Sequence, residues 1–328
     1  MNSARTQIIL RLAMNRRAKA VDAVIQATSA TPSSVEGVPS RPPRRIPEPL
    51  LDGYTMGGKV PLRYCYLDES VPDGKALHLT SEDYQMYFAT FADQRFPYYG
   101  YEGYTFFEAQ EHYPFKNKDI IIYGLAGCNC DAFALWAGAR QLHIVEYNPV
   151  ICEHEKVSVH TPAEFARKGV QADCAISYSS FEHDGLGRYG DPLNPDGDLE
   201  AMAACHRSLK MGGLLFLGIP LGQDCVVFNA HRIYGRHRLP LLLKGYALLD
   251  VFTCYRSAAP EFPFRQPLGE YRDQMLLVLQ TIDTDWPDDD WLLARKASAE
   301  KNAATFRNHR ILSLINKFIH DHKHGLAA

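Results

Sequence analysis

One stretch of the chain, residues 119–149, limits the possible folds more than any other. It begins with a short hydrophobic run, residues 120–123, which is typical of a buried strand. A turn of small residues follows, then a helix-like run over 131–139 and a second strand-like run over 142–147. Strand, glycine turn, helix and strand in this order predict a βαβ unit, and therefore a parallel sheet.

The turn of this unit and an acid beyond it indicate a nucleotide site. Gly124 and Gly127 would let the backbone approach a ligand without a Cβ clash, and the next helix would begin with unpaired N–H groups. Glu146 follows the first glycine by about 20 positions, the spacing at which an acid accepts hydrogen bonds from a ribose diol. The turn does not read G-x-G-x-x-G, so other adenosine ligands and a purely structural glycine turn both stay open.

The composition limits the class of protein to which the chain can belong. The chain has 328 residues, of which 46% are hydrophobic and 22% charged, which suits one large globular domain with extensions or two small ones. A net charge of -3 gives no basic field for nucleic acid, and no apolar run approaches the roughly 20 residues that span a bilayer. The 8 cysteines include no C-x-x-C pair, so buried thiols in a reducing compartment are favoured over disulfides or a metal site.

Four segments are expected along the chain. Residues 1–49 predict an N-terminal helix and a Pro-rich linker, 50–118 an aromatic-rich cap, 119–283 the α/β domain and 284–328 a helical tail. The Arg-rich start fits a surface helix of a cytoplasmic protein, or else a mitochondrial transit peptide. The cap aromatics either pack on the core, which is favoured, or line a substrate pocket. The tail is expected to be a solvated helix with one apolar stripe, with docking on the body as the alternative.

Further strands and helices alternate after Glu146, which predicts a doubly wound sheet. Helix patterns cover residues 81–115, with Ser81 as N-cap, and 233–245, where Arg236 and Arg238 could begin a solvated helix. A long polar loop, 179–198, follows one of the strands. The strands are expected at 157–160, 172–178, 214–220, 247–254 and 274–281.

Two later stretches read SYSSFEH, residues 177–183, and CHRSLKMGGLLFLGIP, residues 205–220. They resemble the central region of class I S-adenosylmethionine-dependent methyltransferases. More narrowly, GLAGCNCDAFAL, VEYNP, SSFEHDGLGRYGDPLNPDGD and VFNAHRIYGRHRLPLLLKGY resemble an uncharacterised domain-of-unknown-function family with nematode, plant and bacterial members. The resemblance, over about 119–281, implies a Rossmann-like methyltransferase sheet that is mostly parallel, with its last strand antiparallel.

The same resemblance implies S-adenosylmethionine as cofactor. Gly124 and Gly127 match the turn beside the methionine part, Glu146 the acid that binds ribose hydroxyls, Thr161 the loop that meets adenine, and Ser179 the strand end beside the methyl donor. The chain departs from the family pattern at residues 128–130, where the third glycine is missing, and at residue 123, which is not an acid. The residues expected to bind the cofactor are Gly124, Gly127, Asn129, Glu146, Tyr147, Thr161 and Ser179.

Methyl transfer requires alignment of the nucleophile and, for a hydroxyl or protonated amine, a base. Glu182, His183 and Asp184 are therefore the predicted catalytic residues. His183 could take a proton near neutral pH while Glu182 or Asp184 orients it. The alternative is that Glu182 and His183 cap the loop and contact backbone.

The long loop and a second polar cluster, 229–238, are expected to face the acceptor. Arg188 could hold an anionic group in a bidentate manner. The acceptor is expected to be a small molecule or a carbohydrate; an inactive binding protein and a nicotinamide-dependent oxidoreductase are the alternatives. The predicted substrate-binding residues are Arg188, Tyr189, Asp191, Asn229, His231 and Tyr234.

Overall fold

The computed structural model describes residues 42–69, 76–97, 100–125, 129–255, 259–272, 274–294 and 307–326. The chain divides between residues 40 and 41, and everything described below belongs to the second unit. The predicted N-terminal helix and possible transit peptide lie outside the described residues. The expected end of the linker, residue 49, falls inside helix α2, Glu48–Thr55, for which Pro47 serves as N-cap.

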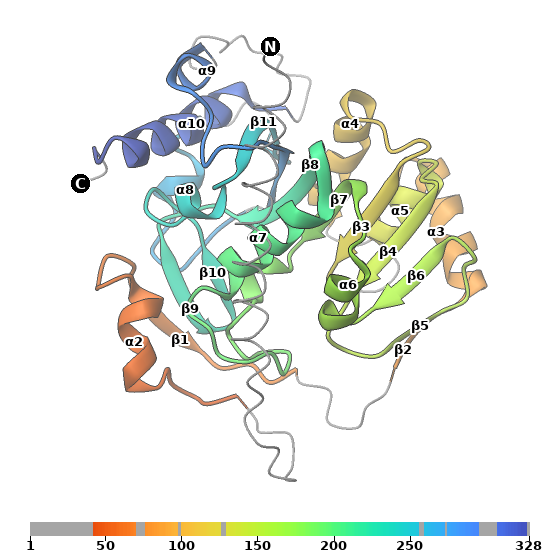
Figure 1. The fold of residues 1–328 in the computed structure, drawn as a ribbon, viewed down its shortest axis with the longest axis horizontal. Helices are drawn as coiled ribbons and strands as arrows, with labels where there is room; N and C mark the ends of the chain where they lie inside the picture. Colours follow the sequence, from red (N-terminus) through yellow and green to blue (C-terminus); the bar gives the residue numbers. More distant parts are fainter. Residues whose placement is uncertain are drawn as a thin grey trace, which may run out of the picture. The chain divides into compact units, whose positions relative to one another are not determined.

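The described part of the chain is built on a seven-stranded sheet in the order β11-β12-β8-β7-β3-β4-β6 (Figure 1). All neighbouring strands from β6 to β8 pair parallel, whereas β12 runs antiparallel to both β8 and β11. The predicted doubly wound, mostly parallel sheet with an antiparallel last strand is confirmed. The strands are β3 Asp119–Tyr123, β4 Gln141–Val145, β6 Val157–His160, β7 Ala172–Tyr178, β8 Leu209–Pro220, β11 Tyr246–Phe252 and β12 Gln274–Thr281.

Helices cover both faces of this sheet, which is why its strands are almost continuously hydrophobic. Successive strand residues alternate between the two layers: Ile120 and Ile122 join one apolar cluster and Ile121 joins the other. The first cluster includes α3 Ser81–Ala92, α4 Tyr104–His112 and α5 Cys130–Trp136. The second includes α6 Pro162–Lys168, α7 Gly197–Ser208, α8 Leu239–Leu242, α9 Asp289–Ala294 and α10 His309–Lys323.

Two small sheets join segments that are distant in sequence. Strand β9, Cys225–Asn229, pairs parallel with β1, Leu62–Cys65, and antiparallel with β10, His231–Ile233. Strand β2, Leu77–Leu79, pairs parallel with β5, Val150–Cys152. Short 3₁₀ turns occur at η1 Gly100–Gly103, η2 Phe181–His183 and η3 Pro263–Arg265.

The long helix predicted over 233–245 is wrong. Asp224 accepts hydrogen bonds from the backbone N–H groups of Gly235, His237 and Arg238 at 2.8–3.0 Å, and these bonds fold the segment into a turn. Only the four-residue helix α8 follows.

The helical pattern predicted over 81–115 is confirmed in part, because α3 ends at Ala92 and α4 begins at Tyr104. Thr80, not Ser81, is the N-cap of α3: its hydroxyl accepts from the N–H of Asp83, and the Asp83 carboxylate accepts in return. The described aromatic residues of this region pack together, as favoured, with ring centroids of Phe96 and Phe106 5.7 Å apart.

The C-terminal helix docks on the body, so the prediction of a solvated helix is wrong and the docking alternative is confirmed. In α10, Ile311, Leu312, Ile315 and Ile319 are at most 1% exposed and belong to the core cluster on one face of the sheet. Arg307 adds an ion pair to Asp250 of β11. Of the cysteines described, all are free thiols, and no helix in the described ranges is long and apolar enough to cross a membrane.

Candidate functional site

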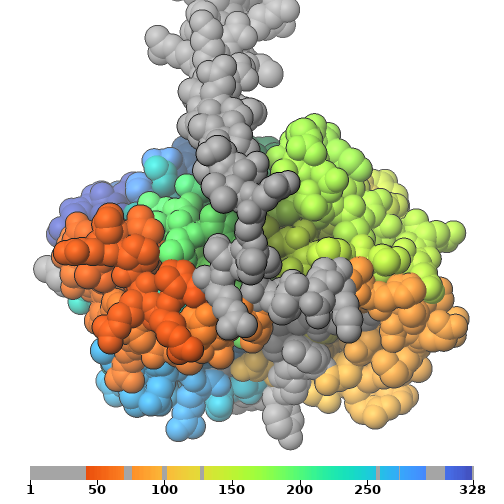
Figure 2. All heavy atoms as spheres, turned by 90° about the horizontal axis from the view of Figure 1, so that it is seen from below, coloured from red at the N-terminus to blue at the C-terminus, as the bar shows by residue number. Residues whose placement is uncertain are grey.

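The candidate site lies at the carboxyl ends of β3, β4 and β7, on the side of the molecule that Figure 2 faces. Gly124 follows β3 with φ of 73°, and its N–H donates to Val145 O of β4 at 3.1 Å. A Cβ at this position would lie 2.4 Å from Ser180 Oγ, so this turn requires glycine both for its left-handed backbone and for space. The three strand ends are thereby drawn together.

Glu146 follows β4 directly, and its carboxylate faces the turn after β3. Oε2 accepts from the N–H of Leu125 at 3.0 Å, and Oε1 accepts from Tyr147 and Asn148 at 2.8 and 3.2 Å. Burial raises the pKa of Glu146 above its ordinary value, and these amide bonds oppose the rise. A carboxylate has about four acceptor sites, so Glu146 keeps roughly one for a ligand.

The other residues expected to bind the cofactor are less uniform in position. Gly127 lies outside the described residues. Asn129 is buried immediately before α5, and Tyr147 is half exposed beside Glu146. Thr161 is the N-cap of α6, where its hydroxyl accepts from Glu164 N at 3.3 Å. Ser179 follows β7 with a left-handed φ of 53°.

A buried carboxylate lies at the end of β7. Glu182 is fully buried in η2, and the side-chain amide of Gln274 donates to Glu182 Oε1 at 3.1 Å and to Ser179 Oγ at 3.3 Å. Burial raises the pKa of Glu182 to about 7. The imidazole of His183 lies beside this carboxylate, with Nε2 3.7 Å from Oε1.

His183 is held in one protonation state by its surroundings. Its Nδ1 lies 2.6 Å from Ala230 O, so Nδ1 carries the proton and donates it to that carbonyl. Burial lowers the pKa of His183 to about 4, so the ring is neutral at pH 7. The acceptor nitrogen Nε2 is therefore the one that lies beside Glu182.

Arg188, Tyr189 and His231 surround this pair. Arg188 donates to Ala230 O at 3.2 Å and to Glu69 Oε1 at 2.8 Å, and its guanidinium lies 4.9 Å from the centre of the Tyr189 ring. Burial, with His183 and Arg188 nearby, lowers the pKa of His231 to about 4. His231 Nε2 is buried and has no hydrogen-bond partner among the residues described.

The structure therefore brings together predicted catalytic and predicted substrate-binding residues from η2, the long loop and β10. Two further members were missed by sequence reasoning. Gln274 begins β12 and bonds Glu182, and the Tyr271 ring packs edge-on against His231 at 5.3 Å. Neither position carried a local signal, because each reaches the site only through the antiparallel return of β12.

Two acids of the long loop lie beside each other. Asp191 accepts from the N–H of Gly187 at 3.0 Å and of Tyr189 at 3.3 Å, and so shapes the loop. Burial raises the pKa of Asp184 well above its ordinary range, and the charge of Asp191 adds to this. Of the two acids expected to orient His183, Glu182 is the one whose carboxylate lies near the ring, with Oε1 3.7 Å from Nε2.

Asn229 and Tyr234 use their polar atoms elsewhere. The amide of Asn229 makes two bonds of 2.8 Å with the backbone of Leu67. The Tyr234 hydroxyl donates to Asp198 Oδ2 at 2.9 Å. Both side chains are fully buried and hold the scaffold around the site.

A buried network of ion pairs, which sequence reasoning did not predict, holds the long loop in place. Arg238 is 2% exposed, which corrects the expectation of a solvated helix start, and forms two bonds of 2.6 and 2.9 Å to Asp198. Burial alone would raise the pKa of Asp198, but Arg232 and Arg238 hold it below its ordinary value. Arg232 also donates to Asp184 O at 2.6 Å, so the network ties the loop backbone to β10.

Comparison with known families gives one match. Residues 118–276 match the model of a family described as "Caenorhabditis protein of unknown function, DUF268". The resemblance to an uncharacterised domain-of-unknown-function family is thus confirmed. No curated protein matches the chain.

Solved structures give distant likenesses. A protein described as a hemolysin from Streptococcus thermophilus is 12% identical, with TM-score 0.36, covering 70% of this chain and 78% of that one. A 1,6-didemethyltoxoflavin-N1-methyltransferase from Burkholderia thailandensis, with bound S-adenosylhomocysteine, is 13% identical, with TM-score 0.41. The match covers 61% of this chain and 87% of that one. The N-methyltransferase NodS from Bradyrhizobium japonicum is 11% identical, with TM-score 0.36. The match covers 54% of this chain and 88% of that one. Likeness this low supports no inference about residues or activity in this chain.

Proposed function

We propose that this protein is an S-adenosylmethionine-dependent methyltransferase acting on a small-molecule or carbohydrate acceptor. One observation carries the proposal: the carboxylate of Glu146, at the end of β4, faces the glycine turn after β3. Ligands of open α/β sheets bind outside the carboxyl ends of the strands, and an acid at this point matches the hydrogen-bonding needs of a ribose. The free thiols of the described residues support a reducing compartment such as the cytoplasm.

Glu146 would receive the ribose hydroxyls and keep part of its bonding to the turn. When bound, S-adenosylmethionine supplies a methyl group on a sulfonium that needs no further activation. The residues of this chain then have to hold the acceptor in line and remove its proton. Gly124 sets the position of the turn because it is packed against Ser180.

The proton of a hydroxyl or ammonium acceptor would go first to His183 Nε2. This nitrogen is unprotonated at pH 7, because the proton of the ring is on Nδ1. A base with a pKa of about 4 holds a proton weakly, whereas Glu182, 3.7 Å away, has a pKa of about 7. The pair would thus carry the proton from the acceptor to Glu182.

Arg188 would favour an acceptor with an anionic group. Its guanidinium is mostly buried and lies at the rim of the Glu182–His183 pair, and its partner Glu69 is more exposed. An acceptor carboxylate or phosphate could replace Glu69 as the ion-pair partner.

A catalytically inactive binding protein is the second candidate. The full burial of Glu182 and the three backbone bonds of Glu146 favour it, because both acids are already satisfied in part. An inactive binding protein would bind S-adenosylmethionine at the same place but would transfer no methyl group.

Calorimetric titration with S-adenosylmethionine, S-adenosylhomocysteine and NAD tests the proposal. The first two should bind and NAD should not; binding of NAD alone would overturn it. Mass spectrometry of a metabolite extract incubated with cofactor and protein then tests turnover. A metabolite that gains the mass of one methyl group in place of hydrogen supports the enzyme, and binding with no methylated product supports the second candidate.

A further inference from the structure

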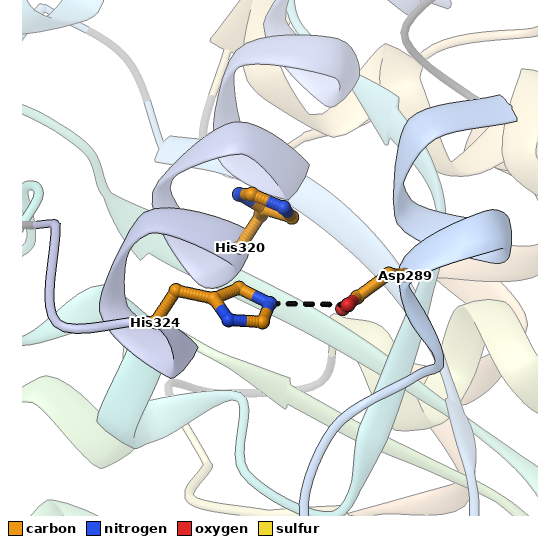
Figure 3. Close-up of side chains that lie close together, drawn as sticks. All are labelled: Asp289, His320 and His324. Atoms are coloured by element: carbon orange, nitrogen blue, oxygen red, sulfur yellow. Dashed lines mark hydrogen bonds and ion pairs between the residues drawn. The ribbon is translucent and has the colours of Figure 1, made fainter.

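A separate group of metal-ligand side chains lies between α9 and α10. His320 lies in the last turn of α10 and His324 is the C-cap residue that follows the helix, with the ring centroids 4.6 Å from each other. Asp289 is the first residue of α9 and faces them across the gap (Figure 3). One ligand atom from each of the three lies within 4.8 Å of the others.

We propose that Asp289, His320 and His324 bind a divalent transition-metal ion of the zinc class. Two histidines at positions i and i+4 present their nitrogens on one helix face, the spacing used by zinc-binding helices. A carboxylate completes a three-ligand set that leaves a position for water. The two histidines and the acid suit zinc, cobalt, nickel or copper better than magnesium or calcium, which prefer oxygen ligands.

The existing distances are close to those that such an ion needs. Zinc binds nitrogen and oxygen at about 2.0–2.2 Å, so neighbouring ligands in a tetrahedral site are roughly 3.3 Å apart. His324 Nε2 and Asp289 Oδ2 are already 3.1 Å apart. His320 has to move by on the order of 1 Å, a shift that a partly exposed side chain makes by rotation.

A lysine holds the carboxylate in place for this role. Lys323 Nζ lies 2.9 Å from Asp289 Oδ1 and 3.2 Å from Pro287 O, so it fixes the start of α9 against α10. Asp289 Oδ2, the oxygen nearer His324, is left for the ion. Bonds of this kind orient metal ligands in known sites.

The alternative is that His324 and Asp289 form only a hydrogen bond. His322 provides a matched control for metal binding by a histidine-rich segment. It lies between the two proposed ligands in sequence, but its ring packs against Trp286 at 5.6 Å. Loss of His322 should therefore leave the site intact.

The test uses the full chain without a tag, stripped by a chelator and dialysed against ZnCl₂. We expect one zinc ion whose affinity falls at least tenfold in His324→Gln and in Asp289→Asn, and is unchanged in His322→Gln. Zinc should also raise the melting temperature of the wild type and of His322→Gln, but not of His324→Gln, whose exposed side chain is not needed for folding. Equal zinc binding by all four proteins, or none by the wild type, would overturn the proposal.

Discussion

At the scale of single residues, burial reverses the order of the pKa values of two neighbours, Glu182 and His183. Glu182 gains proton affinity because its charged form is desolvated, and His183 loses it for the same reason. At pH 7 the histidine is neutral and the carboxyl is near its midpoint. For the proposed proton transfer, Glu182 is the member of the pair whose pKa lies near neutral pH, where a general acid or base works best.

The pKa of Glu182 predicts a pH-dependent stability. Since its folded pKa of about 7 exceeds the ordinary 4.5, its stabilising contribution is complete below pH 4.5 and is lost as pH rises through 7. Glu182→Gln cannot ionise, so its unfolding free energy relative to wild type should rise by about 3 kcal/mol between pH 4.5 and 8. Urea unfolding at both pH values measures this. Exposed Glu155→Gln is the control, and a pH-independent difference for Glu182→Gln would refute the assignment.

The hydrogen-bonding role of Glu146 predicts a loss of cofactor affinity. Glu146→Ala should weaken S-adenosylhomocysteine binding by about 1–3 kcal/mol, the scale of a hydrogen bond to a charged group. Isothermal calorimetry measures the change. The exposed Glu155→Ala should bind as the wild type does; equal affinity in both variants would remove Glu146 from the site.

Sequence reasoning reached part of this site. Glu146, Glu182 and His183 could be identified because they follow hydrophobic strands, and carboxyl ends of parallel strands share one edge. The sequence around Asn229 and Tyr234 does not tell whether their polar atoms bind a ligand or other residues of the protein. Their partners, Leu67 and Asp198, are distant along the chain and could not be inferred.

At the scale of elements, the long loop after β7 owes its shape to buried charges. Asp198 in α7 pairs with Arg238 before α8, and both are almost fully buried. The part of the loop between η2 and α7 is thereby positioned without a helix or strand of its own. The sequence predicted strands 157–160, 172–178 and 274–281 with correct bounds, because buried strands are plain hydrophobic runs. The helix predicted over 233–245 is wrong, because backbone N–H groups at the start of this segment donate to Asp224 and form a turn.

Removal of one partner of this buried pair should be costly. Arg238→Met leaves Asp198 without its two short bonds, and we expect a loss of about 3–5 kcal/mol in unfolding free energy. Arg236→Met, at an exposed position two residues earlier, should change stability by no more than about 0.5 kcal/mol. Chemical denaturation compares the two, and similar losses would contradict the proposed role of the network.

The burial of one face of α10 leads to a further prediction about stability. Ile315 is fully buried against the sheet, so Ile315→Ala should cost about 2–5 kcal/mol through lost burial and a new cavity. Lys317→Ala, on the exposed side, should cost less than about 1 kcal/mol. A small effect at Ile315 in thermal or urea unfolding would mean that the helix is only loosely attached.

At the scale of the whole molecule, the alternation of strands and helices was enough to predict a doubly wound sheet. Hydrophobic runs on neighbouring βα units leave few other ways to bury both faces. The pairings β1–β9 and β2–β5 could not be foreseen, because they join segments far apart in sequence through backbone bonds that leave no pattern. Those pairings matter for function, since Glu69 and Leu67 beside β1 contact the site and its scaffold.

The central claim is that an adenosine ligand binds where Glu146 meets the turn after β3. Amide chemical shifts of Leu125, Tyr147 and Asn148 report on it most directly, because these N–H groups bond the Glu146 carboxylate. Saturation with S-adenosylhomocysteine should shift all three amide signals, while Ile315 in α10 stays unchanged. If all three signals stay in place at saturating ligand, the claim is contradicted.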